Sequence, residues 1–426
     1  MAAESLNLLG PAAAHTSALA VAYSGGLDST VLLHLLRGRT PPGRLRALHV
    51  HHGLQAAAED WAAHCLACGK TQGVPVQILR VKVENTGQGP EAAARTARYV
   101  ALAAQLRPGE VLVTAQHADD QAETLLLNLC RGSGVRGLAA MPVWSEFAPG
   151  FLWRPLLQTP RAALRAYAAA HGLSWIEDPH NADPAYARSR LRKTGLPVLR
   201  EQWPGLIKTL GRTAERMAEA SELLQELGLA DLAGLRADVD HALSVAALRR
   251  MTAARRRNAL RCWIDQQGLP APFQHSLERV DAEMLSARAD ADPVVAWPGA
   301  DLRRYRDRLY AMPTLEPPMS ASLAWDGRTE VLLPGASGRV VAGPGGSPAG
   351  VLRMPRPGER FRPLGASHRR SLKNLFQERG VPTWVRERTP VLECAGSAVW
   401  IGGIGPSADF RGAEPRWLCR LPGAAR

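Results

Sequence analysis

The chain is 426 residues long and carries 52 Lys and Arg residues against 39 Asp and Glu, which gives a net charge of +13 at neutral pH. The length predicts two to four domains with cores of their own, and six cysteines are too few for a scaffold held together by disulfides. The charge favours a polyanionic partner over the alternative that it serves solubility alone, and the few cysteines indicate a reducing, cytoplasmic environment.

Residues 5–27 carry no charged side chain, which could suggest a signal or membrane segment. No basic region precedes them, since the first basic residue is Arg37, and polar residues and glycines interrupt the run. A buried first strand fits this pattern better, so we expect no membrane association.

Strand and helix signals alternate through the first part of the chain, which is the pattern of an α/β domain with a parallel sheet. Apolar runs predict the strands, and a segment with helical periodicity follows each of them. The expected strands are residues 18–23, 46–50, 76–81 and 111–115, and the expected helices begin near residues 30, 56, 91 and 119. Ligands bind at the carboxyl ends of such strands, so the loops at 24–29, 49–54 and 116–120 predict a site at one edge of the sheet.

The loop after the first strand is rich in glycine and consists of Ser24, Gly25, Gly26, Leu27, Asp28 and Ser29. Because it lies between a strand and a helix N-terminus, backbone N–H groups and the positive end of the helix dipole converge on one point, which favours phosphate binding. The alternative is an ordinary tight turn. The motif is no Walker A loop, which needs a Lys before its Ser or Thr. It resembles the SGGxDS loop of the PP-loop ATPases, which cleave ATP to AMP and pyrophosphate.

Two carboxylates are candidates for holding a divalent cation. Beside bound phosphates, Asp28 makes chemical sense as a ligand of a Mg²⁺ ion that bridges the carboxylate and the phosphate. Asp120 opens a helix, where acidic residues usually cap the helix or pair with its dipole. Because this helix start faces the Asp28 loop, we expect Asp28 and Asp120 to share the metal. Glu123, one helical turn further, could bind an ammonium group.

The histidines and cysteines near this edge admit several interpretations. His49 and His51 are expected to contact ATP, with a plain polar loop as the alternative, and the spacing of the histidines matches no zinc template. Cys65 and Cys68 form one CxxC pair on an expected helix. A single pair of this kind is more often two small core residues than a cluster site.

The chain changes character after the first domain. Residues 211–290 have helical spacing and little strand signal, a Pro-rich joint follows at 312–318, and short strands are expected near 330–335, 338–341 and 399–401, with a helix at 371–380. We therefore expect a catalytic domain at 1–205, an all-α domain at 206–312 and a small α+β domain at 319–426. Residues 353–426 hold 14 Lys and Arg against 6 Asp and Glu. Further basic runs at 188–193 and 249–257 favour an extended nucleic-acid surface.

Several motifs in order along the chain resemble those of one enzyme family, the tRNA(Ile)-lysidine synthases in their long form. These motifs are SGGLDS (24–29), HVHHGL (49–54), EAAAR (91–95), VTAQHADDQAET (113–124), RGSGVRGL (131–138), RPLL (154–157), WIEDPHN (175–181), RSRLR (188–192) and RPGERFRP (356–363). The resemblance implies a PP-loop domain of the adenine nucleotide alpha hydrolase-like fold. It also implies the ATP-dependent ligation of free L-lysine to C2 of the wobble cytidine of tRNA(Ile) with a CAU anticodon. The reaction passes through an adenylated cytidine and yields lysidine, AMP and pyrophosphate.

The resemblance also implies roles for single residues. The SGGLDS loop would bind ATP, Asp28 and Asp120 would hold Mg²⁺, Glu123 would hold the lysine, and Arg95 and Arg188 would lie near the reacting groups. The chain has Gln116 and His117 where many members have two histidines, so which of the two contacts ATP stays open, and Ser189 stands where Asn is common. The family includes monomers and dimers, so an oligomer is possible.

Three other functions remain as alternatives. A PP-loop enzyme that thiolates cytidine would need a cysteine pair and an iron–sulfur cluster, for which Cys65 and Cys68 are the only candidates. A glutamine-dependent amidating synthetase would need a glutaminase-like domain, and the sequence has none that is recognisable. A tRNA-binding protein without activity would not need Asp28, Asp120 and the loop glycines.

Overall fold

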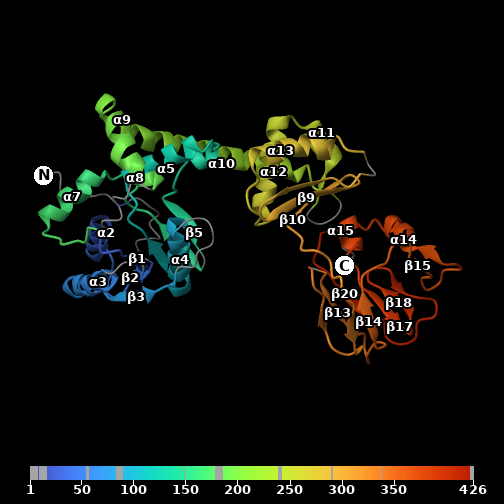
Figure 1. The fold of residues 1–426 in the computed structure, drawn as a ribbon. Coiled ribbons are helices and arrows are strands. Elements are labelled where there is room, and N and C mark those ends of the chain that lie inside the picture. Colours follow the sequence, from blue (N-terminus) through green and yellow to red (C-terminus); the bar gives the residue numbers. More distant parts are fainter. Residues whose placement is uncertain are drawn as a thin grey trace. The chain divides into compact units, whose positions relative to one another are not determined.

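The computed structural model describes residues 8, 17–53, 57–82, 90–147, 149–177, 186–237, 242–288, 291–335 and 337–422. The expected motif residues Leu54 and 178–181 lie outside these ranges. The chain divides into two compact units, Met1–Glu222 and Leu223–Arg426. Figure 1 colours the elements of both units along the sequence.

A six-stranded sheet organises the first unit, with the strand order β3-β2-β1-β4-β6-β5. Neighbouring strands from β3 to β6 are parallel, and only β5 runs antiparallel to its neighbour β6. The parallel sheet and its four expected strands are confirmed, whereas the β5–β6 hairpin was not expected. The bounds are β1 Leu19–Ala22, β2 Leu45–His51, β3 Val76–Arg80, β4 Val111–Val113, β5 Trp144–Phe147 and β6 Gly150–Trp153.

Helices cover both faces of this sheet. Alternate residues of a strand point to opposite faces, so Val21 of β1 joins a core with α2 and α7, while Ala20 joins a core with α4. A strand that is buried on both faces consists of apolar residues throughout, which is why these strands could be predicted. The helices are α2 Leu27–Arg37, α3 Ala58–Gln72, α4 Pro90–Gln105, α5 Ala118–Cys130, α6 Val135–Leu138 and α7 Arg161–Ala170.

A nearly continuous helical segment ends the first unit. It consists of α8 (Ala187–Arg190), a π-helical turn η2 (Leu191–Gly195) and α9 (Leu196–Gln202), and the long helix α10 (Leu206–Ala233) follows it. Leu196 packs with Ala118 and Ala122 of α5 and with Ile207 of α10 in a small apolar core. This packing fixes the segment against the start of α5.

The helical character of the central region is confirmed, but the expectation that it is all-α was wrong. Helices α10 to α13 and η3 pack against a four-stranded sheet of order β7-β10-β9-β8, whose strand pairs are antiparallel. Arginines at 303, 304 and 308 interrupt the apolar residues of two of these strands, so the sequence shows no clear strand pattern there. The buried Arg304 donates hydrogen bonds to the carbonyls of Met284 and Ala287 at the end of η3. The bounds are α11 Val245–Arg250, α12 Ala253–Gln266, α13 Gln274–Arg279, η3 Val280–Leu285, β7 Ala242–Ser244, β8 Val294–Trp297, β9 Ala300–Tyr305 and β10 Arg308–Pro313.

The C-terminal part is rich in short strands, as expected. Tyr310 and Met312 of β10 share an apolar core with Trp384 and Val385, so this part and the central region fold as one unit. The three domain boundaries proposed from sequence stay a prediction. Its elements are β11 Leu323–Trp325, β12 Val331–Leu332, β13 Arg339–Val341, β14 Gly350–Arg353, β15 Arg360–Phe361, β16 Arg370–Ser371, α14 Leu372–Glu378, α15 Thr383–Arg386, β17 Val391–Cys394, β18 Ser397–Ile401, β19 Gly405–Pro406 and β20 Arg416–Leu418. Within the described ranges, no helix combines the length and the hydropathy that crossing a membrane requires.

Candidate active site

The SGGLDS loop connects β1 to α2 and is braced from within. The Ser24 and Ser29 hydroxyls lie 3.1 Å apart, and the Ser29 hydroxyl donates a hydrogen bond of 3.0 Å to the Gly26 carbonyl. The backbone N–H of Ile176 donates to the Gly25 carbonyl at 2.9 Å, so a distant segment holds the loop from outside. These contacts fix the loop backbone before any ligand binds.

Helix α2 begins directly after this loop, with Gly26 at the N-cap position. No side chain in the described part of the protein caps this end. The first N–H groups of a helix have no partner inside the helix, and they carry the positive end of its dipole. The end of α2 therefore has the geometry and charge that bind a phosphate.

Gly25 occupies a position that only glycine tolerates well. Its φ is +78°, and a Cβ built on it would lie 2.8 Å from the Sγ of Cys65 and 3.1 Å from Ile176. A left-handed backbone costs other residues about 1–2 kcal/mol, and here a steric clash adds to that cost. The sequence motif predicts that this position needs glycine. The close contact with Cys65 on α3 explains why a larger residue does not fit.

Gly25→Ala is expected to weaken ATP binding about tenfold or more, since about 1.4 kcal/mol of strain in the loop corresponds to a factor of ten. Titration of the protein with ATP measures the effect. Gly73→Ala is the matched control, because Gly73 has a φ of +64° but a Cβ added there would meet no atom within 4 Å. The control should lose stability without losing ATP affinity. Equal ATP affinities for both variants would contradict the role of the loop geometry.

His117 lies between the two carboxylates that the sequence predicted as metal ligands. Its Nε2 is 3.7 Å from Oδ2 of Asp28 and 3.3 Å from Oδ2 of Asp120. His117 is also the N-cap of α5: its Nδ1 accepts a hydrogen bond from the Asp120 N–H, and Asp120 Oδ2 accepts one from the His117 N–H. The structure thus brings Asp28 and Asp120 together, as expected, around a buried imidazole.

The charges of this cluster stabilise one another. Burial lowers the pKa of His117, but the contact with Asp28 and the charges of Asp120 and Asp119 raise it more, so the pKa lies above the ordinary value. Burial likewise raises the pKa of Asp28, while His117 and Arg161 lower it more, so that pKa is depressed. Both shifts favour an ionised carboxylate at Asp28, the form that binds a cation.

Glu123 is fully buried and paired with two arginines. Arg188 donates from Nε to Oε2 at 2.8 Å, and Arg192 donates from Nε to Oε1 at 2.7 Å and from Nη2 to Oε2 at 2.9 Å. Both guanidinium groups also approach Oδ1 of Asp120, at 3.5 and 3.2 Å. The predicted site residues Asp28, Asp120, Glu123 and Arg188 therefore form one connected cluster.

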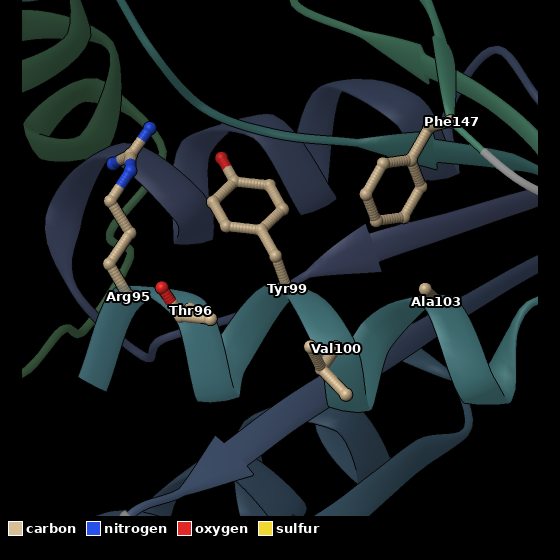
Figure 2. Close-up of a pocket in the computed structure, with 6 residues that line it drawn as sticks. All are labelled: Arg95, Thr96, Tyr99, Val100, Ala103 and Phe147. Carbon is tan, nitrogen blue, oxygen red and sulfur yellow. The ribbon is translucent and has the colours of Figure 1, made fainter. Parts of the chain in front are cut away.

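Arg95, the remaining candidate for the reacting groups, lies in different surroundings. It is exposed on α4, and its guanidinium carbon lies 5.1 Å from the centre of the Tyr99 ring. Figure 2 shows it at one end of a shallow groove of about 390 Å³. The other lining residues are Thr96, Tyr99, Val100, Ala103 and Phe147. None of the contacts of Asp28, Asp120 or Glu123 in the described residues involves Arg95.

The two histidines predicted to bind ATP lie at the end of β2. His49 is buried, and its Nδ1 lies 3.0 Å from the Tyr23 carbonyl and 3.3 Å from Cys65 Sγ. Burial lowers the pKa of His49. Nε2 of His51 lies 3.4 Å from Glu59 on α3. His49 thus supports the backbone before the SGGLDS loop, and contact of either histidine with ATP stays a prediction.

Cys65 and Cys68 lie on α3 beneath the loop. Cys65 is fully buried, and burial raises the pKa of its thiol to about 12. Cys68 Sγ lies 3.3 Å from Nε2 of His64. Among the residues that the structure describes, these two cysteines belong to no group of three or more His, Cys, Asp or Glu arranged to hold a metal ion. This arrangement resembles core packing more than a cluster site.

Cys68→Ala is expected to leave the lysine transfer that the family resemblance implies unchanged, because a half-exposed thiol outside the charged cluster contributes within about 0.5 kcal/mol. A thiolating enzyme that uses the pair would lose its activity altogether. Measuring transfer by the variant and the parent side by side separates the two functions.

Three further residues contribute contacts to this cluster that the sequence alone does not reveal. Arg192 lies in a basic run that predicts a nucleic-acid surface, yet it binds Glu123. The sequence leaves open whether Gln116 or His117 contacts ATP, and it does not indicate that His117 lies between two carboxylates. Arg161, whose Nε lies 3.6 Å from Oδ1 of Asp28, was not considered. Its only signal is its position shortly after β6, at the edge of the sheet where ligands bind.

Three family models match successive parts of the chain. Residues 1–199 match the PP-loop domain, residues 243–310 the TilS substrate binding domain, and residues 351–422 the TilS substrate C-terminal domain. The first of these contains every residue of the charged cluster. The second covers most of the sheet of the central region.

Curated proteins with the name tRNA(Ile)-lysidine synthase are similar to nearly the whole chain. The protein from Alkalilimnicola ehrlichii is 44% identical over 99% of this chain and 96% of its own length. Those from Methylococcus capsulatus and Salmonella typhi are 43% and 41% identical, each over 93% of this chain and over 94% and 95% of their own lengths. A solved structure of the U34-tRNA thiolase NcsA from Methanococcus maripaludis with its [4Fe-4S] cluster covers 50% of this chain and 75% of its own. Its identity of 20% and TM-score of 0.41 are too low to support an argument.

Proposed function

The chain belongs to the tRNA(Ile)-lysidine synthase family, and we propose that it ligates free L-lysine to C2 of the wobble cytidine of tRNA(Ile) with a CAU anticodon, using ATP. The observation that carries this proposal is the charged cluster of Asp28, Asp120 and Glu123 beside a phosphate-binding loop, in a chain similar to such enzymes over nearly its full length. An inactive tRNA-binding protein would not need this cluster.

The first step adenylates the cytidine. The loop and the N-terminus of α2 hold the phosphates of ATP by backbone N–H groups. The O2 atom of the cytidine attacks the α-phosphorus, and pyrophosphate leaves with the electron pair of the broken P–O bond. Such phosphoryl chemistry depends on positioning and on neutralising charge, which a braced loop and fixed cationic groups provide.

The donor set fits Mg²⁺. Asp28 and Asp120 supply carboxylate oxygens, and Oδ1 of Asp28 is buried without a hydrogen-bond partner among the described residues, so one ligand atom is free to bind a cation. Mg²⁺ is typically held by one or two carboxylates together with substrate phosphates, and when bound it would neutralise the phosphate charge.

The second step transfers lysine. Its neutral ε-amine attacks C2, the C2–O bond breaks with its electron pair going to AMP, and the nitrogen loses a proton. Glu123 binds the charged α-ammonium group of lysine. This group replaces one of the two guanidinium groups that are paired with Glu123. The displaced guanidinium of Arg188 or Arg192 then turns toward the phosphate of the adenylated cytidine. Arg95, at the end of its groove, contacts the tRNA near the reacting base.

The net charge of +13 suits a tRNA partner, since phosphate contacts supply much of the affinity for nucleic acids. The cytoplasm is the proposed location. All six cysteines are free thiols, as a reducing compartment requires.

A lysine-transfer assay tests the proposal. The protein is mixed with ATP, Mg²⁺, radiolabelled lysine and a tRNA(Ile) transcript with a CAU anticodon, and the label in precipitated tRNA is counted. We expect label that depends on ATP and is lost when the wobble cytidine is changed to uridine. A transcript of the methionine tRNA with the same anticodon measures specificity. Bound tRNA without label would contradict the proposal and favour thiolation or a binding protein.

A further inference from the structure

Arg161 is the first residue of α7 and has no role in the chemistry described so far. Its backbone N–H donates a 2.9 Å hydrogen bond to Oδ2 of Asp119, and the Ala118 N–H donates one of 3.0 Å to the Thr159 carbonyl. These bonds tie the start of α7 to the start of α5. The base of the Arg161 side chain is therefore held in a fixed position beside the cluster.

The guanidinium of Arg161 and the carboxylate of Asp28 face each other without forming a hydrogen bond. Nε of Arg161 lies 3.6 Å from Oδ1 of Asp28, and both atoms are buried with no hydrogen-bond partner in the described part of the chain. A buried polar atom without a hydrogen bond is costly, so a ligand that supplies the missing hydrogen bonds would be favoured here. A phosphate oxygen would satisfy Arg161, and a cation bound to that phosphate would satisfy Asp28.

The two oxygens of Asp28 face different parts of the site. Oδ2 faces His117 and, beyond it, Asp120 and the Glu123 cluster on α5, where the proposed function places lysine. Oδ1 faces Arg161 on α7. Arg161 is thus on the side of Asp28 that is turned away from the lysine end, where the phosphates that leave as pyrophosphate would be separated from the site of lysine attack.

We propose that Arg161 binds the β- and γ-phosphates of ATP, which leave together as pyrophosphate; this inference rests on the proposed function and names a further residue of the same site. As the cytidine O2 forms its bond to the α-phosphorus, the bond from that phosphorus to the bridging oxygen breaks, and its electron pair goes to pyrophosphate. The guanidinium neutralises the charge that develops there. Its planar fork suits phosphate oxygens better than an ammonium group does.

The test compares nucleotides with and without the β- and γ-phosphates. In Arg161→Gln, the Kd for ATP with Mg²⁺ is expected to rise about tenfold or more, as for a lost charged hydrogen bond, while the Kd for AMP stays within a factor of two. Adenylation of tRNA without lysine, followed in a single turnover, should slow about 100-fold. Arg165→Gln is the matched control, since Arg165 lies one turn along α7 and pairs with the exposed Glu177 at 3.7 Å. It should change neither Kd.

Arg161→Lys, which keeps the charge and disturbs the fold least, should bind ATP with intermediate affinity. An unchanged Kd for ATP in both variants would overturn the inference, and so would equal losses of ATP and AMP affinity, which indicate a structural role. Lysidine formation by the parent protein is measured in the same preparation. If the parent forms no lysidine, the proposed function fails, and the comparison of ATP with AMP still decides whether Arg161 binds the terminal phosphates.

Discussion

Asp28→Ala is expected to reduce lysine transfer at least about 1000-fold, because the variant removes a charge that acts directly on the reacting phosphates. The carboxylate lies at the first turn of α2, beside the loop, and lies close to the side chains of both His117 and Arg161. The affinity for tRNA should change little, since it depends on contacts spread over the chain. Transfer is measured with labelled lysine, and tRNA affinity by filter binding.

Asp60→Ala is the control for this experiment. Asp60 is an exposed acidic residue in the first turn of α3, so it shares the helix position and the charge of Asp28 but not the surroundings. Its replacement should leave transfer unchanged. Residual transfer above one tenth of the parent rate in Asp28→Ala would show that the carboxylate does not hold the reactive phosphates.

Glu123→Gln is expected to have the second largest effect, on stability as well as on activity. The change leaves Arg188 and Arg192 facing a neutral amide. Breaking a buried ion pair typically costs 3–5 kcal/mol, and because the two guanidinium groups are about one third exposed to water, we expect about 2–3 kcal/mol. Urea unfolding measures this loss. Lysine transfer should fall about 100-fold, whereas adenylation of tRNA persists, because the carboxylate is proposed to serve only the second step.

Glu283→Gln provides the comparison for Glu123→Gln. Glu283 forms a bidentate ion pair with Arg279, but both side chains are nearly half exposed, Glu283 at 46% and Arg279 at 44%. The loss of stability there should be far smaller than for Glu123→Gln, because water screens an exposed ion pair. If Glu123→Gln stops adenylation as completely as transfer, Glu123 acts in the first step, and its assignment to lysine is wrong.

The features that the sequence predicts correctly are those that depend on residues close together in the chain. Val21 and Val113 lie in runs that are apolar because both faces of the sheet are covered, and Gly25 lies in a motif whose turn needs glycine. Neighbouring residues in the chain do not show which charged side chain will pair with which other one. In the sequence, Arg192 and Arg304 both look like surface charges. In the structure, Arg192 binds Glu123, and the buried Arg304 donates a hydrogen bond to the Met284 carbonyl at the end of η3.

The central sheet was missed for the same reason. The adjacent arginines Arg303 and Arg304 interrupt the apolar residues of β9, Arg308 opens β10, and the surrounding helices dominate the periodicity of the region. The position of Arg161 near Asp28 depends on how α7 packs against the sheet, which no local pattern encodes. The sequence therefore does not predict ion pairs between residues that are far apart in the chain. Most residues of the proposed chemistry belong to such pairs.

The π-helical turn η2 makes the segment from α8 to α9 sensitive to insertions and deletions. Arg188, Arg192, Leu196 and Arg200 are spaced by four residues, and all of them meet α5. In a regular α-helix, each step of four residues drifts by about 40° around the axis, so three steps would carry Arg200 well off this face. The wider turn of η2 takes back part of the drift. Deleting one residue beside the exposed Thr194 would therefore rotate Arg200 away from Asp119 although every charged residue is retained. Substitutions are tolerable at such a position, whereas insertions and deletions are not.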